Sequence, residues 1–341
     1  MKALLVPKKQ AETLRKQLLE AGYMDTRRRL KVRGNDLEIP VNGYVPPEFV
    51  RFPNINQEKP EYYENEPTLQ DLMKTYVDGD ELDLLPGGWQ ILGNVVITSL
   101  HPDLYPLRAK VGDALLTIYP YCKSVYLDGG IKGELRRPSR EIIAVREGVD
   151  EPSKTVHTEN GCRFKLDVTK VMFSKGNLNE RARMGRLGRD EVVIDMFAGI
   201  GYFTIHMAVH GGTEKITAIE LNPESYQYLV ENITLNHVEK IVEPVLGDCA
   251  ENTPVSVADR VVMGYVGKTH QYLPYGIAAL KQGGMLHYHE TVPELLMPDR
   301  AMERISTEAK RQGRKVEIVH WHRVKKYAPG VWHVVVDARI I

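Results

Sequence analysis

Two glycines and two carboxylates along the chain have the spacing of a nucleoside-binding site. Gly199 and Gly201 directly follow an apolar run, and glycines there let the backbone turn sharply and approach a ligand at the start of a helix. Glu220 stands about 20 residues further on, where a carboxylate accepts hydrogen bonds from ribose hydroxyls. Asp248 ends a third apolar run, from which it can accept a hydrogen bond from an adenine amino group. The four residues predict a site for an adenosine-containing cofactor.

The residues around this pattern narrow the choice of cofactor. A dinucleotide-binding loop carries a third glycine, and that position is Thr204 here. We therefore expect S-adenosylmethionine rather than NAD. The residues assigned to the site by adjacency are Phe197, Ala198, Leu221 and Cys249. The alternative interpretation is structural, because an ordinary strand-to-helix turn also uses Gly-x-Gly, and a lone acid often caps a helix.

The elements that must position these residues alternate regularly in the second half of the chain. Strands are predicted at residues 191–197, 215–221, 241–248, 258–265, 283–291, 315–324 and 330–340, with helices at 202–211, 222–236, 269–282 and 292–313. This alternation predicts a parallel sheet with crossover helices, and the two last strands predict an antiparallel hairpin at its edge. The fold class is α/β, a seven-stranded Rossmann-like domain that resembles the class I S-adenosylmethionine transferases.

The first half of the chain predicts a smaller, mixed α+β N-terminal region. Residues 1–65 read as a small α/β unit and linker, because a strand and an amphipathic helix lead into a run rich in Pro, Asn, Glu and Tyr. Residues 66–155 read as a mixed α+β middle domain, since short β-rich runs alternate with Gly and Pro turns. Residues 156–341 form the predicted catalytic domain.

Composition excludes several classes of protein. The 341 residues are 43% hydrophobic and 26% charged, which is ordinary for a globular chain and unlike collagen or disordered sequence. The 45 Lys and Arg balance the 45 Asp and Glu, so basic surface is expected only in local patches. No apolar run approaches the roughly 20 residues of a membrane span, and the N-terminus becomes charged too early for a signal peptide. We expect a cytoplasmic protein.

Cysteines and histidines give no pattern of a metal site. Cys122, Cys162 and Cys249 are scattered without a Cys-x-x-Cys pair, so neither a disulfide framework nor a zinc site is predicted. Alternate histidines in a strand share one face and can bind a metal. They occur here as the pairs His287/His289 and His320/His322, and His333 also lies near the C-terminus. Without a carboxylate or cysteine at a recognisable spacing, we expect no metal.

Three longer motifs carry a resemblance to a known family. The run TVHTENGCRFKLDVTKVMFSKGNLNERARMG is followed by VVIDMFAGIGYFTI and then by AIELNPESYQYLVENITLN. These runs closely resemble the family that contains the tRNA guanosine-37 N1-methyltransferases and the wybutosine-pathway aminocarboxypropyltransferases. The resemblance covers about residues 110–341, and its motifs are not general features of the fold.

The end of the fourth strand indicates a branch of that family. In the methyltransferases this strand ends in Asn-x-Pro, whereas here the matching residues are Met263-Gly264-Tyr265. The following VGKTHQYLP resembles the aminocarboxypropyl branch. The resemblance therefore implies transfer of the 3-amino-3-carboxypropyl group of S-adenosylmethionine to carbon 7 of 4-demethylwyosine, at position 37 of tRNA(Phe), with release of methylthioadenosine. The alternatives are a guanosine-37 N1-methyltransferase, a non-catalytic tRNA-binding scaffold and a small-molecule methyltransferase.

The resemblance also assigns residues to the methionine arm and to catalysis. Ser174 and Arg181 match positions that contact the carboxylate and amino end of the cofactor, and Lys175 is assigned with them; the alternative is a capped surface helix with solvated arginines. Tyr265 and His270 are candidates for lining the acceptor pocket, with His270 as acceptor of the proton lost from carbon 7. Such residues also commonly cap the next helix.

The partner implied by the resemblance is the anticodon stem-loop of tRNA(Phe). Two stretches have an excess of basic residues that could bind phosphates, at 160–190 and between 123 and 146, the latter holding Lys123, Lys132, Arg136, Arg137, Arg140 and Arg146. A solvated surface is the alternative for these residues. We expect the enzyme to be a monomer and to have no membrane partner.

Overall fold

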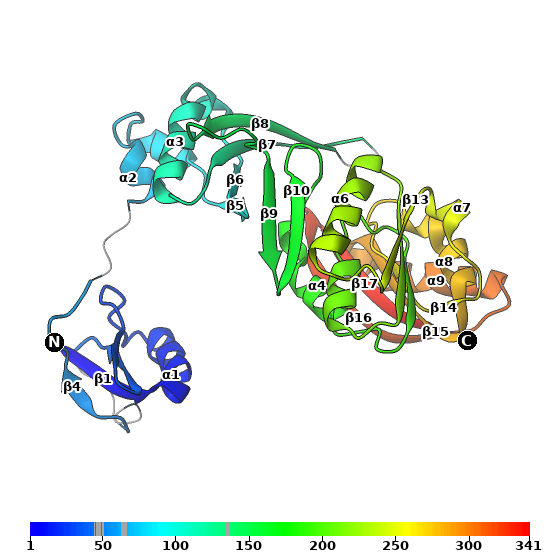
Figure 1. Cartoon of the computed structure of the whole chain (residues 1–341), viewed down its shortest axis with the longest axis horizontal. Coiled ribbons are helices and arrows are strands. Elements are labelled where there is room, and N and C mark those ends of the chain that lie inside the picture. Colours follow the sequence, from blue (N-terminus) through cyan, green and yellow to red (C-terminus); the bar gives the residue numbers. More distant parts are fainter. Residues whose placement is uncertain (44, 46–48, 50, 63–66, 134–136) are drawn as a thin grey trace. The chain divides into compact units, whose positions relative to one another are not determined.

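The structure, a computed structural model, describes residues 1–43, 45, 49, 51–62, 67–133 and 137–341. Within these residues no helix is long and apolar enough to cross a membrane. The chain forms two compact units, Met1–Asp71 and Leu72–Ile341 (Figure 1). The further division of the second unit between residues 155 and 156 stays a prediction from the sequence.

The first unit is a four-stranded sheet with one helix. Its elements are β1 (Lys2–Pro7), α1 (Lys8–Glu20), β2 (Lys31–Arg33), β3 (Asp36–Pro40) and β4 (Asn54–Asn56). The strands follow the order β2-β3-β1-β4, with β1 antiparallel to β3 and β4. Leu14 and Leu18 lie one turn apart on α1 and are buried in the core of the unit.

Helix α2 (Leu69–Met73) spans the boundary between the two units, and the second unit begins with a mixed part. Its elements are η2 (Gly79–Leu84), β5 (Trp89–Leu92), β6 (Val95–Thr98), η3 (Pro102–Leu107), α3 (Arg108–Ile118), β7 (Ser124–Lys132), β8 (Arg137–Val145), β9 (Lys154–Glu159) and β10 (Cys162–Asp167). Strands β5-β6-β7-β8 form one sheet, and β9 and β10 form a separate antiparallel pair. Asn160 and Gly161 join that pair with positive φ at both residues, as a tight hairpin turn requires.

The rest of the second unit contains the predicted seven-stranded sheet. Its elements are η4 (Lys175–Asn177), α4 (Leu178–Met184), β11 (Val192–Asp195), α5 (Thr204–His210), β12 (Lys215–Glu220), α6 (Pro223–Leu235), β13 (Val242–Leu246), α7 (Cys249–Asn252), β14 (Ala258–Met263), η5 (Thr269–Tyr272), α8 (Leu273–Ala279), β15 (Leu280–Pro293), η6 (Glu294–Leu296), α9 (Asp299–Arg311), β16 (Val316–Ala328) and β17 (Val331–Ile340). The strand order is β13-β12-β11-β14-β15-β17-β16. The five neighbouring strands β13, β12, β11, β14 and β15 are parallel. Strand β17 runs antiparallel to β15 and β16. The predicted fold class and edge hairpin are confirmed.

Successive residues of the central strands enter two different cores. On β11, Val193 belongs to the core shared with β10, α4, α5 and α6, and Ile194 belongs to the core shared with α8 and α9. On β14, Val262 and Val261 divide between the two cores in the same way. A sheet covered on both faces explains why these strands read as continuous apolar runs.

The first strand of the last hairpin is longer than predicted. The sequence pattern predicts that this strand ends at Val324, but β16 continues to Ala328, because residues of the 325–328 segment pair with β17. The turn lies at Gly330, whose φ is 68°. Strand extension places Lys325 directly opposite His333, and opposed residues of antiparallel strands share one face of the sheet.

Two asparagines of α6 hold β10 by its backbone. Asn232 accepts from the Lys165 N–H at 2.6 Å and donates to the Lys165 carbonyl at 3.2 Å. Asn236, one turn later, bonds the Arg163 N–H and carbonyl at 2.8 and 2.7 Å. Four helical residues rise about 6 Å and two strand residues about 6.7 Å, so the two spacings match. The two asparagine side chains therefore bond backbone N–H and carbonyl groups of β10 that a neighbouring strand would otherwise bond.

We predict that Asn232→Ala lowers the free energy of unfolding of the second unit by about 2 kcal/mol or more, because its fully buried amide leaves Lys165 and Ile200 backbone groups unsatisfied. Trp89, Trp321 and Trp332 all lie in this unit, so tryptophan fluorescence during urea denaturation reports it selectively.

Asn236→Ala is the matched control, because it removes equivalent bonds at a half-exposed position where water can replace them. It should cost clearly less than Asn232→Ala. Equal losses for the two variants would contradict the argument from burial.

Candidate active site

A cavity of about 290 Å³ lies where the order of the strands in the seven-stranded sheet reverses, between β11 and β14. From β11 the chain proceeds to β12 and β13 on one side and returns to β14 on the other. In such sheets the carboxyl ends of the strands flanking this switch point form a crevice. The loops after β11 and β14 supply Phe197 and Tyr265 to the lining.

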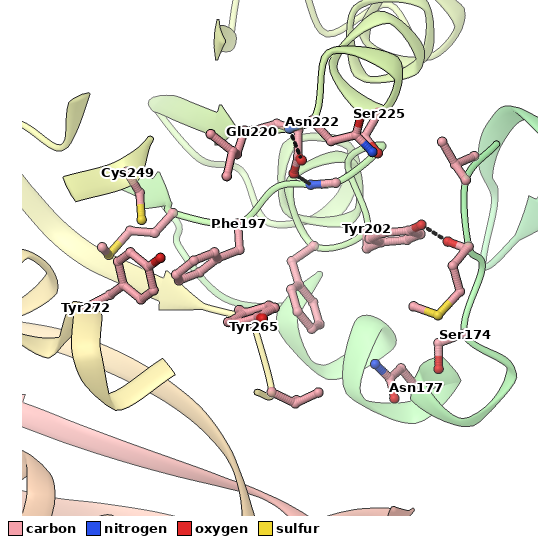
Figure 2. A pocket seen from close by; sticks show the side chains of 18 of the residues that line it. Ser174, Asn177, Phe197, Tyr202, Glu220, Asn222, Ser225, Cys249, Tyr265 and Tyr272 are labelled. Atoms are coloured by element: carbon pink, nitrogen blue, oxygen red, sulfur yellow. Dashed lines mark hydrogen bonds between the residues drawn. The ribbon is translucent and has the colours of Figure 1, made fainter. Parts of the chain in front are cut away.

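The lining residues form two ends of different chemistry. Phe197, Glu220, Cys249 and Tyr272 lie together at one end, whereas Ser174, Asn177 and Tyr202 lie at the other, with Tyr265 between them (Figure 2). We call these the Glu220 end and the Ser174 end.

Glu220 organises the loop at the first end. Its two carboxylate oxygens accept the backbone N–H groups of Gly199 at 2.7 Å and Asn222 at 2.8 Å. Burial raises the pKa of Glu220, and the bonds from Asn222 and Gly199 partly oppose this effect. Each carboxylate oxygen has more than one acceptor site, so the group can still accept hydroxyl donors from a ligand.

Gly199 is needed at its position for a steric reason. Its φ is 59°, and a Cβ there would lie 2.4 Å from the ring of Tyr202. Tyr202 in turn donates its hydroxyl hydrogen to the Met172 carbonyl. The glycine therefore lets the loop after β11 pass close to the segment that leads to Ser174.

Aromatic rings form the wall between the two ends. Tyr265 stacks on Phe197 with ring centroids 5.4 Å apart and an interplanar angle of 26°. The rings of Tyr272 and Phe197 pack edge to face, with centroids 5.2 Å apart. Gly264 has its own steric role, since a Cβ would lie 2.8 Å from the ring of Phe203. The Gly-Tyr pair at the end of β14 thus accommodates one ring and supplies another.

The remaining residues of the Glu220 end include a cap and apolar surface. Asp248 accepts a hydrogen bond from the Ala250 N–H at 2.9 Å. One of its oxygens therefore caps α7, which is the alternative role that the sequence allows for a lone acid. Burial raises the pKa of the Cys249 thiol to about 12, which keeps it neutral. Leu221 lines the cavity although its side chain is 53% exposed, and a ligand there would cover it.

The Ser174 end is built from two segments far apart in the chain. Lys325 donates to the Ser174 hydroxyl at 2.5 Å, so an ammonium group from β16 reaches the loop before α4. Asn177 and His333 also line this end. The backbone of Lys175 lies in η4, but its side chain is outside the part that the structure describes.

Arg181 lines the cavity, and its guanidinium is already engaged. Its Nε and NH2 donate to the two oxygens of Glu159 at 2.5 and 2.6 Å, and its NH1 donates to the Ser174 carbonyl at 3.1 Å. Burial raises the pKa of Glu159, but the bonds from His157 and Arg181 outweigh it and hold the pKa at about 2. This buried pair positions Ser174.

Three residues assigned to the site do not line the cavity. Ala198 supports the loop by donating its N–H to the Ile219 carbonyl at 2.9 Å, and Gly201 packs against Ile205. His270 lies in η5, where burial and the nearby charge of Arg304 lower its pKa. The structure therefore does not bring His270 to the cavity, because η5 turns it toward α9.

The sequence interpretation missed several lining residues, among them Lys325, Tyr327 and His333 of the C-terminal hairpin. No local motif marks them. They reach the cavity only because β16 and β17 lie beside β15 in the sheet.

The basic stretch between residues 123 and 146 is partly structural. Arg140 pairs with Asp128, and Arg146 donates to the carbonyls of Cys122 and Leu116 at 2.7 and 2.6 Å. Arg136 and the side chain of Lys132 lie outside the described residues. In the described part of the chain, no group of three His, Cys, Asp or Glu residues could hold a metal ion.

Comparisons with known proteins agree with the fold. The TRM5/TYW2 methyltransferase domain matches residues 155–319, the TYW2 N-terminal domain 69–149 and the tRNA methyltransferase 5 N-terminal domain 3–49. A tRNA(Phe) (4-demethylwyosine(37)-C(7)) aminocarboxypropyltransferase of Pyrococcus horikoshii is 39% identical over 275 residues, covering 80% of this chain and 96% of that protein.

A methyltransferase and a solved structure are also similar. The tRNA (guanine(37)-N(1))-methyltransferase Trm5b of Pyrococcus abyssi is 34% identical over 346 residues, covering 99% of this chain and 98% of that protein. The crystal structure of P. horikoshii TYW2 in complex with MeSAdo has a TM-score of 0.71 and 37% identity, covering 81% of this chain and 99% of that one.

We predict that Glu159→Gln destabilises the second unit by about 3 kcal/mol near neutral pH, because removing one partner of a buried pair leaves the Arg181 charge uncompensated. The pKa of Glu159 is depressed in the folded state, so its contribution is fully present above pH 4.5 and is lost as the pH falls toward about 2. The difference between wild type and variant in urea denaturation should shrink across that interval.

The control is Glu151→Gln, which breaks the exposed pair with Lys154. It should leave the stability curve essentially unchanged, because water screens exposed pairs. A difference for Glu159→Gln that is constant from pH 7 to pH 2 would contradict the assignment.

Proposed function

The chain belongs to the TRM5/TYW2 family, and from this premise we propose that it is an aminocarboxypropyltransferase that acts on tRNA. It transfers the 3-amino-3-carboxypropyl group of S-adenosylmethionine to carbon 7 of 4-demethylwyosine at position 37 of tRNA(Phe) and releases methylthioadenosine. The observation that carries this function is the end of β14, where Gly264 and Tyr265 supply packing and an aromatic wall in place of an amide beside the acceptor.

The Glu220 end has the chemistry needed to hold the adenosine half of the donor. The Glu220 carboxylate faces the glycine loop and suits ribose hydroxyls. Phe197, Leu221 and Cys249 supply apolar surface beside it, and the second oxygen of Asp248 suits an adenine amino group. Cofactor contacts at these residues are our proposal.

The Ser174 end suits the methionine arm. We assign the carboxylate of the arm to the Lys325 ammonium and the Ser174 hydroxyl, which already lie 2.5 Å apart. Arg181 then acts on the methionine arm only indirectly, because its guanidinium is bonded to Glu159. It positions Ser174 by donating to the Ser174 carbonyl. When bound, the donor supplies a sulfonium whose γ-carbon is open to attack, and placing the acceptor in line with it selects the transferred group.

A second candidate function has specific support. Residues 3–49 match the N-terminal domain of tRNA methyltransferase 5, and the Trm5b relative aligns with 99% of this chain, whereas the aminocarboxypropyltransferase aligns with 80%. A guanosine-37 N1-methyltransferase is therefore the alternative. Location in the cytoplasm and the monomeric state remain predictions.

We predict that the protein converts S-adenosylmethionine to methylthioadenosine when given tRNA(Phe) that carries 4-demethylwyosine. Chromatography of the small-molecule products and mass spectrometry of the digested tRNA would follow the reaction. A matched tRNA with unmodified guanosine 37 should give no product. Formation of adenosylhomocysteine with that tRNA would contradict the proposal and establish the methyltransferase.

We further predict that Lys325→Gln weakens S-adenosylmethionine binding about tenfold or more, because a charge-assisted hydrogen bond to the carboxylate is lost. Methylthioadenosine lacks the aminocarboxypropyl arm, so its dissociation constant in calorimetry should stay within about twofold of wild type.

Lys326→Gln provides the control, since Lys326 is exposed on the same strand and should change neither affinity. An equal loss of affinity for both ligands in Lys325→Gln would contradict the assignment of Lys325 to the arm.

A further inference from the structure

A buried histidine lines the Ser174 end of the cavity, and one of its ring nitrogens has no hydrogen-bond partner in the described part of the chain. His333 lines the cavity and is 1% exposed. Its Nε2 lies 3.0 Å from Nδ1 of His289, whereas its Nδ1 has no hydrogen-bond partner among the residues that the structure describes. A buried polar atom without a hydrogen-bond partner lowers the stability of a folded protein. The unpaired Nδ1 of His333 therefore indicates that a ligand bonds to it.

The neighbours of His333 on the sheet place it on the cavity side. It stands opposite Lys325 on β16 and opposite Thr291 on β15, so the three side chains share one face. Lys325 bonds Ser174, and the Thr291 hydroxyl donates to the Val266 carbonyl at 3.0 Å. Ser174 and Val266 both line the cavity.

The charge of a buried carboxylate favours one tautomer of the two rings. Glu180 is 3% exposed, and its Oε1 lies 3.9 Å from Nε2 of His289. This separation is longer than a hydrogen bond, and Nε2 of His289 has no hydrogen-bond partner among the described residues. Because a carboxylate only accepts, its negative charge still favours the proton on that Nε2. Nδ1 of a neutral His289 is then the acceptor, so His333 donates to it from Nε2. The proton of His333 is thereby held on Nε2, and its Nδ1 keeps a free lone pair.

We propose that Nδ1 of His333 is the base that removes the proton from carbon 7 of the acceptor, an inference that rests on the proposed function. The π electrons at carbon 7 form the new bond to the γ-carbon, and the carbon–sulfur bond breaks with its electron pair remaining on sulfur. The adduct then carries a positive charge and still has its carbon 7 hydrogen. His333 takes that proton, and the electrons of the carbon–hydrogen bond restore the aromatic ring.

The environment of His333 suits this step. Burial lowers its pKa to about 2, and His289 and Lys325 act in the same direction, so the ring stays neutral and ready to accept. A weak base is sufficient, because a cationic adduct is a strong carbon acid. The charged and titratable groups that face the ring are His289, Lys325, Glu180 and His322, and Glu180 supplies the negative charge that stabilises a transiently protonated ring.

A row of titratable groups leads from His333 toward solvent. His322 donates from Nε2 to Oε2 of Glu180 at 2.7 Å, and its side chain is 26% exposed. The row passes through His333, His289, Glu180 and His322, and its step from His289 to Glu180, at 3.9 Å, is longer than a hydrogen bond.

The test uses two substitutions that keep different halves of the imidazole. His333→Gln places an amide near Nε2 and retains a donor to His289, but it removes the acceptor at Nδ1. His333→Asn places a polar atom near Nδ1 and loses the contact with His289. The exposed His320, on β16, gives the matched control His320→Gln, which should leave turnover unchanged.

We predict that His333→Gln lowers kcat about 100-fold or more, while the calorimetric dissociation constant for methylthioadenosine stays within about twofold of wild type. Proton removal then limits turnover, so tRNA deuterated at carbon 7 of demethylwyosine should react more slowly than protiated tRNA in the variant, by more than in wild type. His333→Asn should lose kcat to a similar extent, because a side-chain amide does not accept the proton at this position either.

Three results would overturn the proposal. One is a kcat of His333→Gln within a few fold of wild type, and the second is a large loss of kcat with no deuterium effect. The third is loss of methylthioadenosine binding in both variants, which would make His333 a structural residue. Wild-type turnover to adenosylhomocysteine would instead show that the proposed function itself has failed.

Discussion

The carboxylate of Glu180 is almost completely buried, and groups from three separate parts of the chain hold it. Arg183 donates to it at 2.7 and 3.0 Å, His322 donates at 2.7 Å, and His289 faces it from β15. Burial raises the pKa of Glu180, but the bonds from His322 and Arg183 more than reverse this effect and keep it ionised. The carboxylate thereby ties α4 to the C-terminal strands. This attachment supports the position of the Ser174 end, and the negative charge of Glu180 favours the tautomer assigned to His333.

The end of β14 illustrates how packing and chemistry share residues. Gly264 has no side chain because the Phe203 ring occupies the adjacent space, and Phe203 in turn packs against His289 with centroids 5.1 Å apart. Tyr265 stacks on Phe197 between the two ends of the cavity. A strand end without an acid or amide is therefore well packed, and the polar group that faces the acceptor comes from β17.

The fold, and the meeting of three residues at one end of the cavity, could be predicted from the sequence for a physical reason. Gly199, Glu220 and Asp248 each lie at or just after the end of a parallel strand. The carboxyl ends of such strands meet at one edge, so sequence order alone brings these residues together. Lys325 and His333 could not be found in this way, because their place depends on β17 inserting between β15 and β16. The resemblance assigns Arg181 to a ligand carboxylate, and nothing in its own segment shows that Glu159 bonds its guanidinium. The resemblance also makes His270 a candidate for the acceptor pocket, whereas its side chain in η5 is not among the residues that line the cavity.

The central claim is that a buried carboxylate presents a proton acceptor to the cavity through two histidine rings. The most direct test is nitrogen NMR of the free protein labelled with 15N in its histidines, with the His333 signals assigned by comparison with a variant that lacks this ring. The account predicts that at neutral pH Nε2 of His333 carries the proton and Nδ1 does not. A proton on Nδ1, or on both nitrogens, would contradict it.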